Sequence, residues 1–164
     1  MKKAVWSAIA TAAGVLLFTT SASAQTTAQV NVSVTVAARA LLTLDTNAIN
    51  FADADPDSVP VLTAPAINIA VRTRTPAGGA VSLTVQATGD LSAGLGATIP
   101  INQLTWTATG TGYVGGTSAT TAQGVGAWTG SGNRAGTQTY SLPNSWDYVT
   151  GTYTTTLNYT LAVP

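Results

Sequence analysis

Eight residues near the middle of the chain read Val81-Ser82-Leu83-Thr84-Val85-Gln86-Ala87-Thr88. Apolar and polar side chains alternate along this stretch, so an extended chain carries one apolar face and one polar face. A helix would spread the same apolar residues around its circumference. The stretch therefore predicts a β-strand with one buried side and one solvated side.

The same alternation appears in four other stretches, at residues 29–36, 67–72, 104–109 and 153–163. It is typical of antiparallel sheets, because the strands of parallel sheets are apolar on both faces. The chain is also rich in Thr, whose β-branched side chain favours a half-exposed strand. Two such sheets bury their apolar faces by packing together. We therefore expect an all-β fold, an antiparallel β-sandwich.

Three stretches are expected to connect the strands. Pro76-Ala77-Gly78-Gly79 has the residues of a tight turn and predicts a hairpin between its flanking strands. Residues 53–65 contain three prolines and are interpreted as a loop. Residues 110–136 are rich in Gly, Thr and Ser, and we expect short strands and ordered loops there.

The first 24 residues contain the three parts of a secretory signal peptide. Lys2 and Lys3 make a positive start, residues 4–18 are apolar, and small residues follow at Ala22-Ser23-Ala24. The apolar stretch is about 15 residues long, whereas a membrane-spanning helix needs about 20. We expect export and cleavage after residue 24; an uncleaved membrane anchor is the alternative.

Cleavage would leave residues 25–164 as a single secreted domain with an N-terminal strand at residues 28–36. A chain of this length can bury a core large enough to be stable without disulfides. We expect no membrane insertion after the signal peptide is removed.

The residue types of this mature chain disfavour most kinds of catalysis. It has no Lys, Glu, His or Cys, and its four Arg minus six Asp give a net charge of −2. Serine and cysteine hydrolases need a base or a thiol that the chain lacks, and nucleic-acid binders need a basic surface. We expect no enzyme activity, no cofactor and no nucleic-acid partner; a hydrolase built from Asp alone is the enzymatic alternative.

Asp53, Asp55 and Asp57 alternate along one loop in a pattern that suits Ca²⁺, which prefers oxygen ligands. The loop does not fit an EF-hand, because Ser58 stands at the sixth position and Ala64 at the twelfth. A solvated acidic loop and a Ca²⁺ site of another geometry both remain open. We therefore assign no metal site.

Three tryptophans lie outside the expected signal peptide. Trp106 is on the apolar side of its expected strand and is predicted to lie in the core. Trp128 and Trp146 are surrounded by small and polar residues, so they are candidate aromatics for stacking against a glycan.

The two ends of the mature chain carry a signal for assembly. Val30, Val32, Val34 and Val36 lie on one face of the N-terminal stretch. A terminal strand can pair within its own subunit or be donated to a neighbour, where backbone pairing gives register-specific association. Donation repeated head to tail builds an open filament. We therefore assign these valines to a donor strand at a subunit interface.

Together with these valines, the C-terminal stretch resembles that of chaperone–usher fimbrial subunits. Gly151 is the fourteenth residue from the end, as in that family's C-terminal strand. Alternating apolar residues follow it: Tyr153, Leu157, Tyr159, Leu161 and Val163. Two features depart from the family, since Val163 stands where its penultimate residue is Tyr, and its paired Cys are missing.

The resemblance implies an incomplete immunoglobulin-like sandwich whose N-terminal extension completes the next subunit. It implies a role in a pilus and in cell adhesion, with other copies or related surface subunits as partners and a periplasmic chaperone during export. The expected location runs from the periplasm to the cell surface or an extracellular filament. The alternative is a self-complete sandwich that keeps both terminal strands.

The C-terminal residues are also similar to the motif of WxL-type surface domains, which associate with cell walls. That motif has Trp at the position of Tyr159, and Trp106-Thr107-Ala108 has Ala where Leu is expected. This resemblance implies an alternative function, a cell-surface module that binds a cell-wall polymer or glycan.

Overall fold

The structure, a computed structural model, describes residues 25–94 and 96–164. The expected signal peptide at residues 1–24 lies outside the described residues. The chain divides into two units after Val34, ten residues beyond the expected domain boundary. The strands of the described part all lie in the second unit, residues 35–164, and pair antiparallel. The prediction of an all-β antiparallel fold is confirmed.

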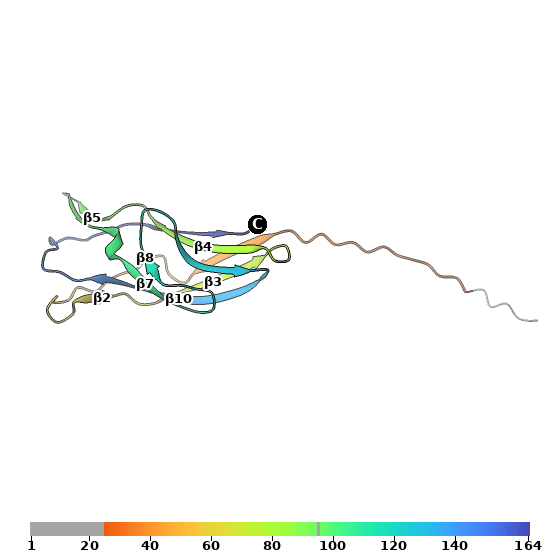
Figure 1. Ribbon diagram of the computed structural model, residues 1–164, viewed down its shortest axis with the longest axis horizontal. Helices are drawn as coiled ribbons and strands as arrows, with labels where there is room; N and C mark the ends of the chain where they lie inside the picture. The colour runs from red at the N-terminus through yellow and green to blue at the C-terminus, as the bar shows by residue number, and fades with distance from the viewer. Residues whose placement is uncertain (1–24, 95) are drawn as a thin grey trace, which may run out of the picture. The chain divides into compact units, whose positions relative to one another are not determined.

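Six of the described strands form the larger sheet, in the order β1-β3-β10-β7-β8, with β2 paired to the end of β10 (Figure 1). Their bounds are β1 (Arg39–Leu44), β2 (Val61–Thr63), β3 (Ile67–Arg74), β7 (Thr105–Thr109), β8 (Gly116–Thr117) and β10 (Gly132–Pro143). β1 therefore lies at one edge of this sheet and β8 at the other.

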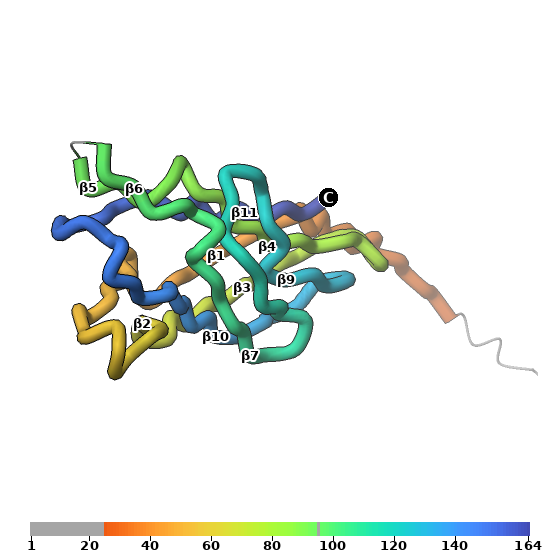
Figure 2. Tube along the Cα trace, turned by 60° about the vertical axis from the view of Figure 1, so that its left-hand side comes forward, coloured from red at the N-terminus to blue at the C-terminus, as the bar shows by residue number. Residues whose placement is uncertain are grey.

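A second sheet has the order β11-β4-β9, formed by β4 (Ala80–Ala87), β9 (Gln123–Thr129) and β11 (Leu157–Ala162). The separate pair β5 (Leu91–Gly94) and β6 (Ala97–Ile99) is followed by the 3₁₀ turn η1 (Ile101–Gln103). Figures 1 and 2 show the second sheet lying over the larger one, in a β-sandwich-like arrangement of two layers.

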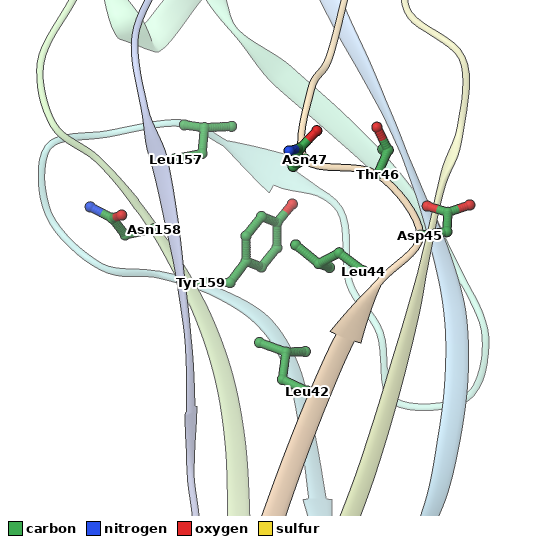
Figure 3. A pocket seen from close by; sticks show the side chains of 8 residues that line it. All are labelled: Leu42, Leu44, Asp45, Thr46, Asn47, Leu157, Asn158 and Tyr159. Carbon is green, nitrogen blue, oxygen red and sulfur yellow. The ribbon is translucent and has the colours of Figure 1, made fainter.

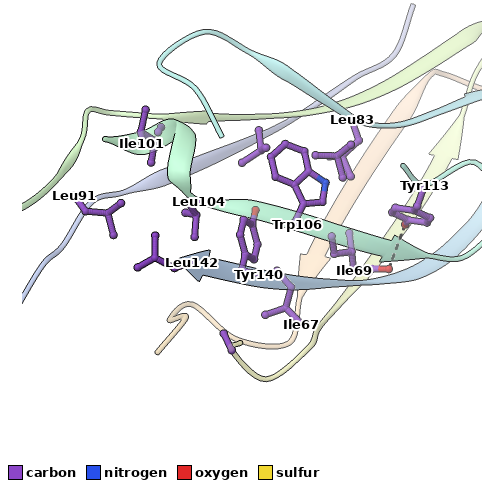
Figure 4. Packing of buried hydrophobic residues seen from close by; sticks show 14 of the residues in the cluster. Ile67, Ile69, Leu83, Leu91, Ile101, Leu104, Trp106, Tyr113, Tyr140 and Leu142 are labelled. Carbon is purple, nitrogen blue, oxygen red and sulfur yellow. Dashed lines mark hydrogen bonds between the residues drawn. The ribbon is translucent and has the colours of Figure 1, made fainter. Parts of the chain in front are cut away.

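The apolar faces of the two sheets meet in one core (Figure 4). On β4, the side chains of Val81, Leu83 and Val85 are buried and alternate with the polar side chains between them, as the alternation predicts. Ile69 on β3 and Trp106 on β7 face them from the larger sheet and are also buried. The prediction that Trp106 belongs to the core is confirmed.

Two expected connections differ from the structure. Residues 76–79 form a turn, in which the N–H of Gly79 donates to the C=O of Pro76 at 3.0 Å. This turn is not a hairpin, because β3 and β4 on either side of it belong to different sheets. The expected loop at residues 53–65 contains a strand, because β2 pairs with the end of β10.

Two expected strand regions also differ. The N-terminal strand expected at residues 28–36 is not formed, since residues 25–38 carry no strand in the structure. A strand needs partners for its backbone groups, and no described residue pairs with this stretch. The short strands and ordered loops predicted at residues 110–136 are there in part, since the two-residue β8 lies between loops, but the same range also contains the seven-residue β9 and the start of the 12-residue β10.

Candidate functional site

β1 and β11 are edge strands of opposite sheets, and they lie beside one another along one side of the sandwich. Figure 3 shows them running in opposite directions on either side of a groove of about 640 Å³. Among the described residues, no backbone hydrogen bond joins the two strands. The groove is lined by Leu42, Leu44, Asp45, Thr46, Asn47, Leu157, Asn158 and Tyr159.

The core is incompletely covered along this groove. Leu42 and Leu44 on β1, and Leu157 on β11, pack against the core but remain half-buried. By contrast, Val71 on β3 and Leu83 on β4, one strand further in, are 0 % exposed. The apolar side chains of the core therefore remain partly open to solvent along this groove.

The opposite side of the sandwich is closed by backbone hydrogen bonds. The N–H of Val114 donates to the C=O of Val125 at 2.9 Å, and the N–H of Ala127 donates to the C=O of Gly112 at 3.0 Å. These bonds tie the segment before β8 to β9, and so join the edges of the two sheets. The opening between β1 and β11 is therefore specific to that side.

The sequence of β11 lacks the features that usually protect an edge strand. Exposed edges commonly carry Lys, Pro or a bulge, which prevent pairing with another chain. β11 contains no charged residue and no Pro, and it pairs with β4 in regular register from Leu157 to Ala162. Its outer N–H and C=O groups therefore form a template for one more strand.

A hydrogen-bonded pair of tyrosines links the two sheets behind the groove. Tyr159 on β11 donates its hydroxyl to the Oε1 atom of Gln138, and it shares a hydrogen bond of 2.8 Å with the hydroxyl of Tyr140. Gln138 and Tyr140 both lie on β10 and are buried. Burial raises the pKa of Tyr140 to about 12, and burial together with the neighbouring Tyr140 raises the pKa of Tyr159.

These pKa shifts predict a loss of stability in alkaline solution. An unfolded tyrosine ionises near pH 10, whereas Tyr140 stays protonated in the folded chain up to about pH 12. The unfolded state therefore binds fewer protons in this window, and the free energy of unfolding falls as the pH rises. Urea unfolding between pH 8 and pH 12 should show a fall of roughly 2 kcal/mol from Tyr140. The fall should be smaller in Tyr140→Phe, and stability unchanged up to pH 12 would contradict this interpretation.

The predicted donor residues lie outside any strand and face solvent. Val30, Val32, Val34 and Val36 are 86 %, 90 %, 84 % and 61 % exposed. A contiguous row of exposed apolar side chains on a soluble protein marks an interaction segment. The N-terminal stretch therefore has the alternation and exposure of a strand that pairs with no strand in the described part of the chain.

The predicted C-terminal residues divide between β11 and its flanks. Three of them face the core from β11: Leu157, Tyr159 and Leu161. Tyr153 precedes the strand and donates its hydroxyl to the C=O of Val149 at 2.7 Å. Gly151 lies in the same loop, and the half-buried Val163 follows the strand. Leu157 and Tyr159 are the members of this set that line the groove.

The two candidate glycan-binding tryptophans lie in different environments. Trp128 on β9 packs edge-on against Tyr113, with ring centroids 4.9 Å apart, and donates its indole N–H to the C=O of Thr111 at 2.8 Å. Trp146, in the loop after β10, is 70 % exposed and donates to the carboxylate of Asp57 at 3.2 Å. The ring of Trp146 is therefore open to solvent, whereas that of Trp128 is partly covered by its own subunit.

The aspartates of the loop before β2 do not converge. The carboxylate of Asp55 accepts a hydrogen bond from the N–H of Asp57 at 2.9 Å, and that of Asp57 faces Trp146. Over residues 25–94 and 96–164, no group of three or more His, Cys, Asp or Glu side chains could hold a metal ion. The alternating carboxylates therefore do not form a ligand cluster in this structure.

The sequence pattern did not single out Leu42 and Leu44, which form the β1 wall of the groove. The run Leu41-Leu42-Thr43-Leu44 is apolar on both faces at its start, because Leu41 is 53 % exposed on the outer side. The alternation of Leu42 with Leu44 indicates a strand with one buried face. The neighbouring Leu41 interrupts this alternation, because it is apolar but exposed.

No protein-family model matches the chain, and no curated protein matches it at a significant level. Within the described residues, no helix has the length and apolar character needed to cross a membrane. The groove and the valine-bearing stretch are therefore the features from which a function can be argued.

Proposed function

We propose that the protein is a pilin-like surface subunit that assembles by β-strand donation. The open groove between β1 and β11 carries this proposal, because Leu42, Leu44 and Leu157 pack against the core there and remain half-buried. The donor is the stretch from Val30 to Val36 of another copy. In this proposal the fold is an incomplete immunoglobulin-like sandwich.

The donor stretch and the edge strand β11 have similar lengths. Six residue steps separate Val30 from Val36, which is about 20 Å in an extended strand. β11 has six residues from Leu157 to Ala162, and spans a similar length. With the valines facing the groove, the alternating polar residues Asn31, Ser33 and Thr35 would face solvent.

Burial of the valines supplies a driving force. Each exposed Val gains about 1.5 kcal/mol on full burial, or roughly 6 kcal/mol for the four before the cost of ordering the segment. Pairing with the open edge of β11 adds backbone hydrogen bonds. A chain that keeps these valines in water forgoes both contributions.

The connection between donor and β1 favours another copy as acceptor. Ala37 and Ala38 alone separate Val36 from Arg39, the first residue of β1. Folding back antiparallel to β1 would need a two-residue turn with positive φ, which suits Asn-Gly and not Ala-Ala. Running parallel to β1 in the same chain would need a crossover of about a dozen residues.

Repeated donation gives a head-to-tail filament. The proposal includes export directed by residues 1–24, assembly at the cell surface and a role in adhesion. A periplasmic chaperone would cover the groove before a donor strand arrives. The partners are other copies of this chain or related surface subunits.

Deletion of Gln25–Val36 tests the proposal. The mature chain should form oligomers, and the deleted chain should stay monomeric with its sandwich intact, because Val30 to Val36 contribute nothing to the core. Size-exclusion chromatography and electron microscopy would report assembly, and circular dichroism would report the fold. A shorter deletion of Gln25–Ala28, which keeps the valines, is the matched control. Identical filaments from both deletions would refute strand donation.

A further inference from the structure

The charges of the sandwich are sorted toward opposite ends. Arg39 at the start of β1 stands directly opposite Arg74 at the end of β3. Arg72 is two residues back on the same face of β3 and pairs with Asn133, next to Arg134. The arginines of the mature chain therefore gather at the end of the sandwich where β1 begins; we call this the basic end.

The aspartates lie toward the other end, which we call the acidic end. Asp53, Asp55 and Asp57 precede β2, and Asp147 follows β10 in a loop whose Trp146 donates a hydrogen bond to Asp57. Asp45 and Asp90 follow the ends of β1 and β4. β10 connects the two ends, and its 12 residues span roughly 35 Å. Figures 1 and 2 show β2 and the start of β10 at opposite ends of the layers.

Among residues 25–94 and 96–164, no ion pair within the subunit joins the two groups. The guanidinium of Arg134 donates to the C=O groups of Asn133 and Thr129. In the part of the chain that the structure describes, the aspartates accept from amide, hydroxyl and indole donors rather than from arginines. Arg39 and Arg74 are like charges directly opposite one another, which destabilises a sheet. A local cost of this kind points to a role beyond the isolated subunit.

We propose that the basic end of each subunit docks against the acidic end of the next copy, an inference that rests on the proposed strand donation. A donated strand that pairs antiparallel with β11 runs in the same direction as β1. It therefore leaves the acceptor beyond Leu44, at the acidic end. Ala37 and Ala38 then lead from Val36 to Arg39, at the basic end of the donor. Insertion in the reverse direction would bring two basic ends together.

Trp146 fits this contact. Its exposed ring lies beside the carboxylate of Asp57, so a guanidinium arriving there meets both an aromatic face and an anion. The cationic side chains of residues 25–164 are all Arg, the residue best suited to such stacking and to bidentate pairing. The same copy therefore carries both halves of a complementary interface.

Neutralising the basic end tests this inference. The mature chain with Arg72→Gln and Arg74→Gln should assemble about tenfold more slowly at low salt, because complementary charge accelerates association by about 10- to 1,000-fold. At 1 M NaCl the difference should vanish. The control, Ser82→Glu with Gln86→Glu, makes the same change of net charge on the outer face of β4 and should assemble at the unchanged rate.

Charge exchange gives a second arm. Arg72→Glu with Arg74→Glu should stop assembly at low salt, and adding Asp53→Lys with Asp57→Lys to the same chain should restore it.

Equal rates for the unchanged chain and the glutamine variant would overturn docking while leaving strand donation intact. Absence of assembly by the unchanged chain would refute both. Normal assembly of the glutamine variant with lost retention on heparin would assign the arginines to an anionic polymer, and would overturn docking.

Discussion

Mature chains carrying Val32→Asp and Val34→Asp are expected to stay monomeric at concentrations at which the unchanged chain forms oligomers. Both valines are exposed in the isolated subunit, so the sandwich folds without them. In the donated strand they would pack against the leucines that line the groove, Leu42, Leu44 and Leu157, where an unpaired carboxylate is costly. Since each 1.4 kcal/mol weakens association tenfold, we expect a loss of more than about 100-fold. Sedimentation velocity over a concentration series measures it.

The control uses the same charges on the other face of the same segment. Asn31→Asp with Ser33→Asp adds two carboxylates that stay in solvent when the valines face the groove, so this chain should still assemble. Unimpaired assembly of the valine variant would contradict the assignment of the donor face. Equal loss in both variants would show that added charge alone, and not its burial, prevents association.

The sequence predicted where the strands lie along the chain better than it predicted which strands pair with one another. Alternation located β4 and β11 and the burial of Trp106, because period-two patterning reflects a sheet with one wet face. It did not show that β3 and β4 belong to different sheets. Pro76 and Gly79 specify that the chain reverses, whereas the sheet that the next strand joins depends on contacts far away in the sequence.

The sequence predicted the donor stretch but not the groove, because the groove also depends on contacts between residues far apart in the sequence. The valines can be recognised from the sequence because their alternation is a local pattern. Alternation shows that a segment suits a strand with one buried face, but it does not show which part of the protein would bury that face. Residues 28–36 therefore form no strand in their own chain. The groove depends on bringing Leu44 beside Leu157, which lie more than 100 residues apart. No local pattern contains that information.

The charge sorting was equally hidden in the sequence. Arg39 and Arg74 are far apart along the chain, and the register of β1 and β3 places them opposite one another. Asp57 and Asp147 likewise belong to separate loops that meet through Trp146. The composition predicted a weakly charged protein, and the topology arranges its few charges into two ends.

Cysteine cross-linking tests donation between copies, the central claim, most directly. The chain contains no Cys, so every disulfide must come from introduced residues. Mature chains carrying Val34→Cys and Leu157→Cys would place both thiols in the groove on the core-facing side of adjacent strands, within reach of a disulfide. If the strand enters antiparallel to β11, Val34→Cys should cross-link to Leu157→Cys far better than Val30→Cys does.

The outcome is read on a non-reducing gel after mild oxidation. We predict a ladder of covalent oligomers from the chain that carries both Val34→Cys and Leu157→Cys, and a cross-linked dimer when two chains with one cysteine each are mixed. A disulfide confined to monomers, with no dimer from the mixture, would contradict strand donation between copies.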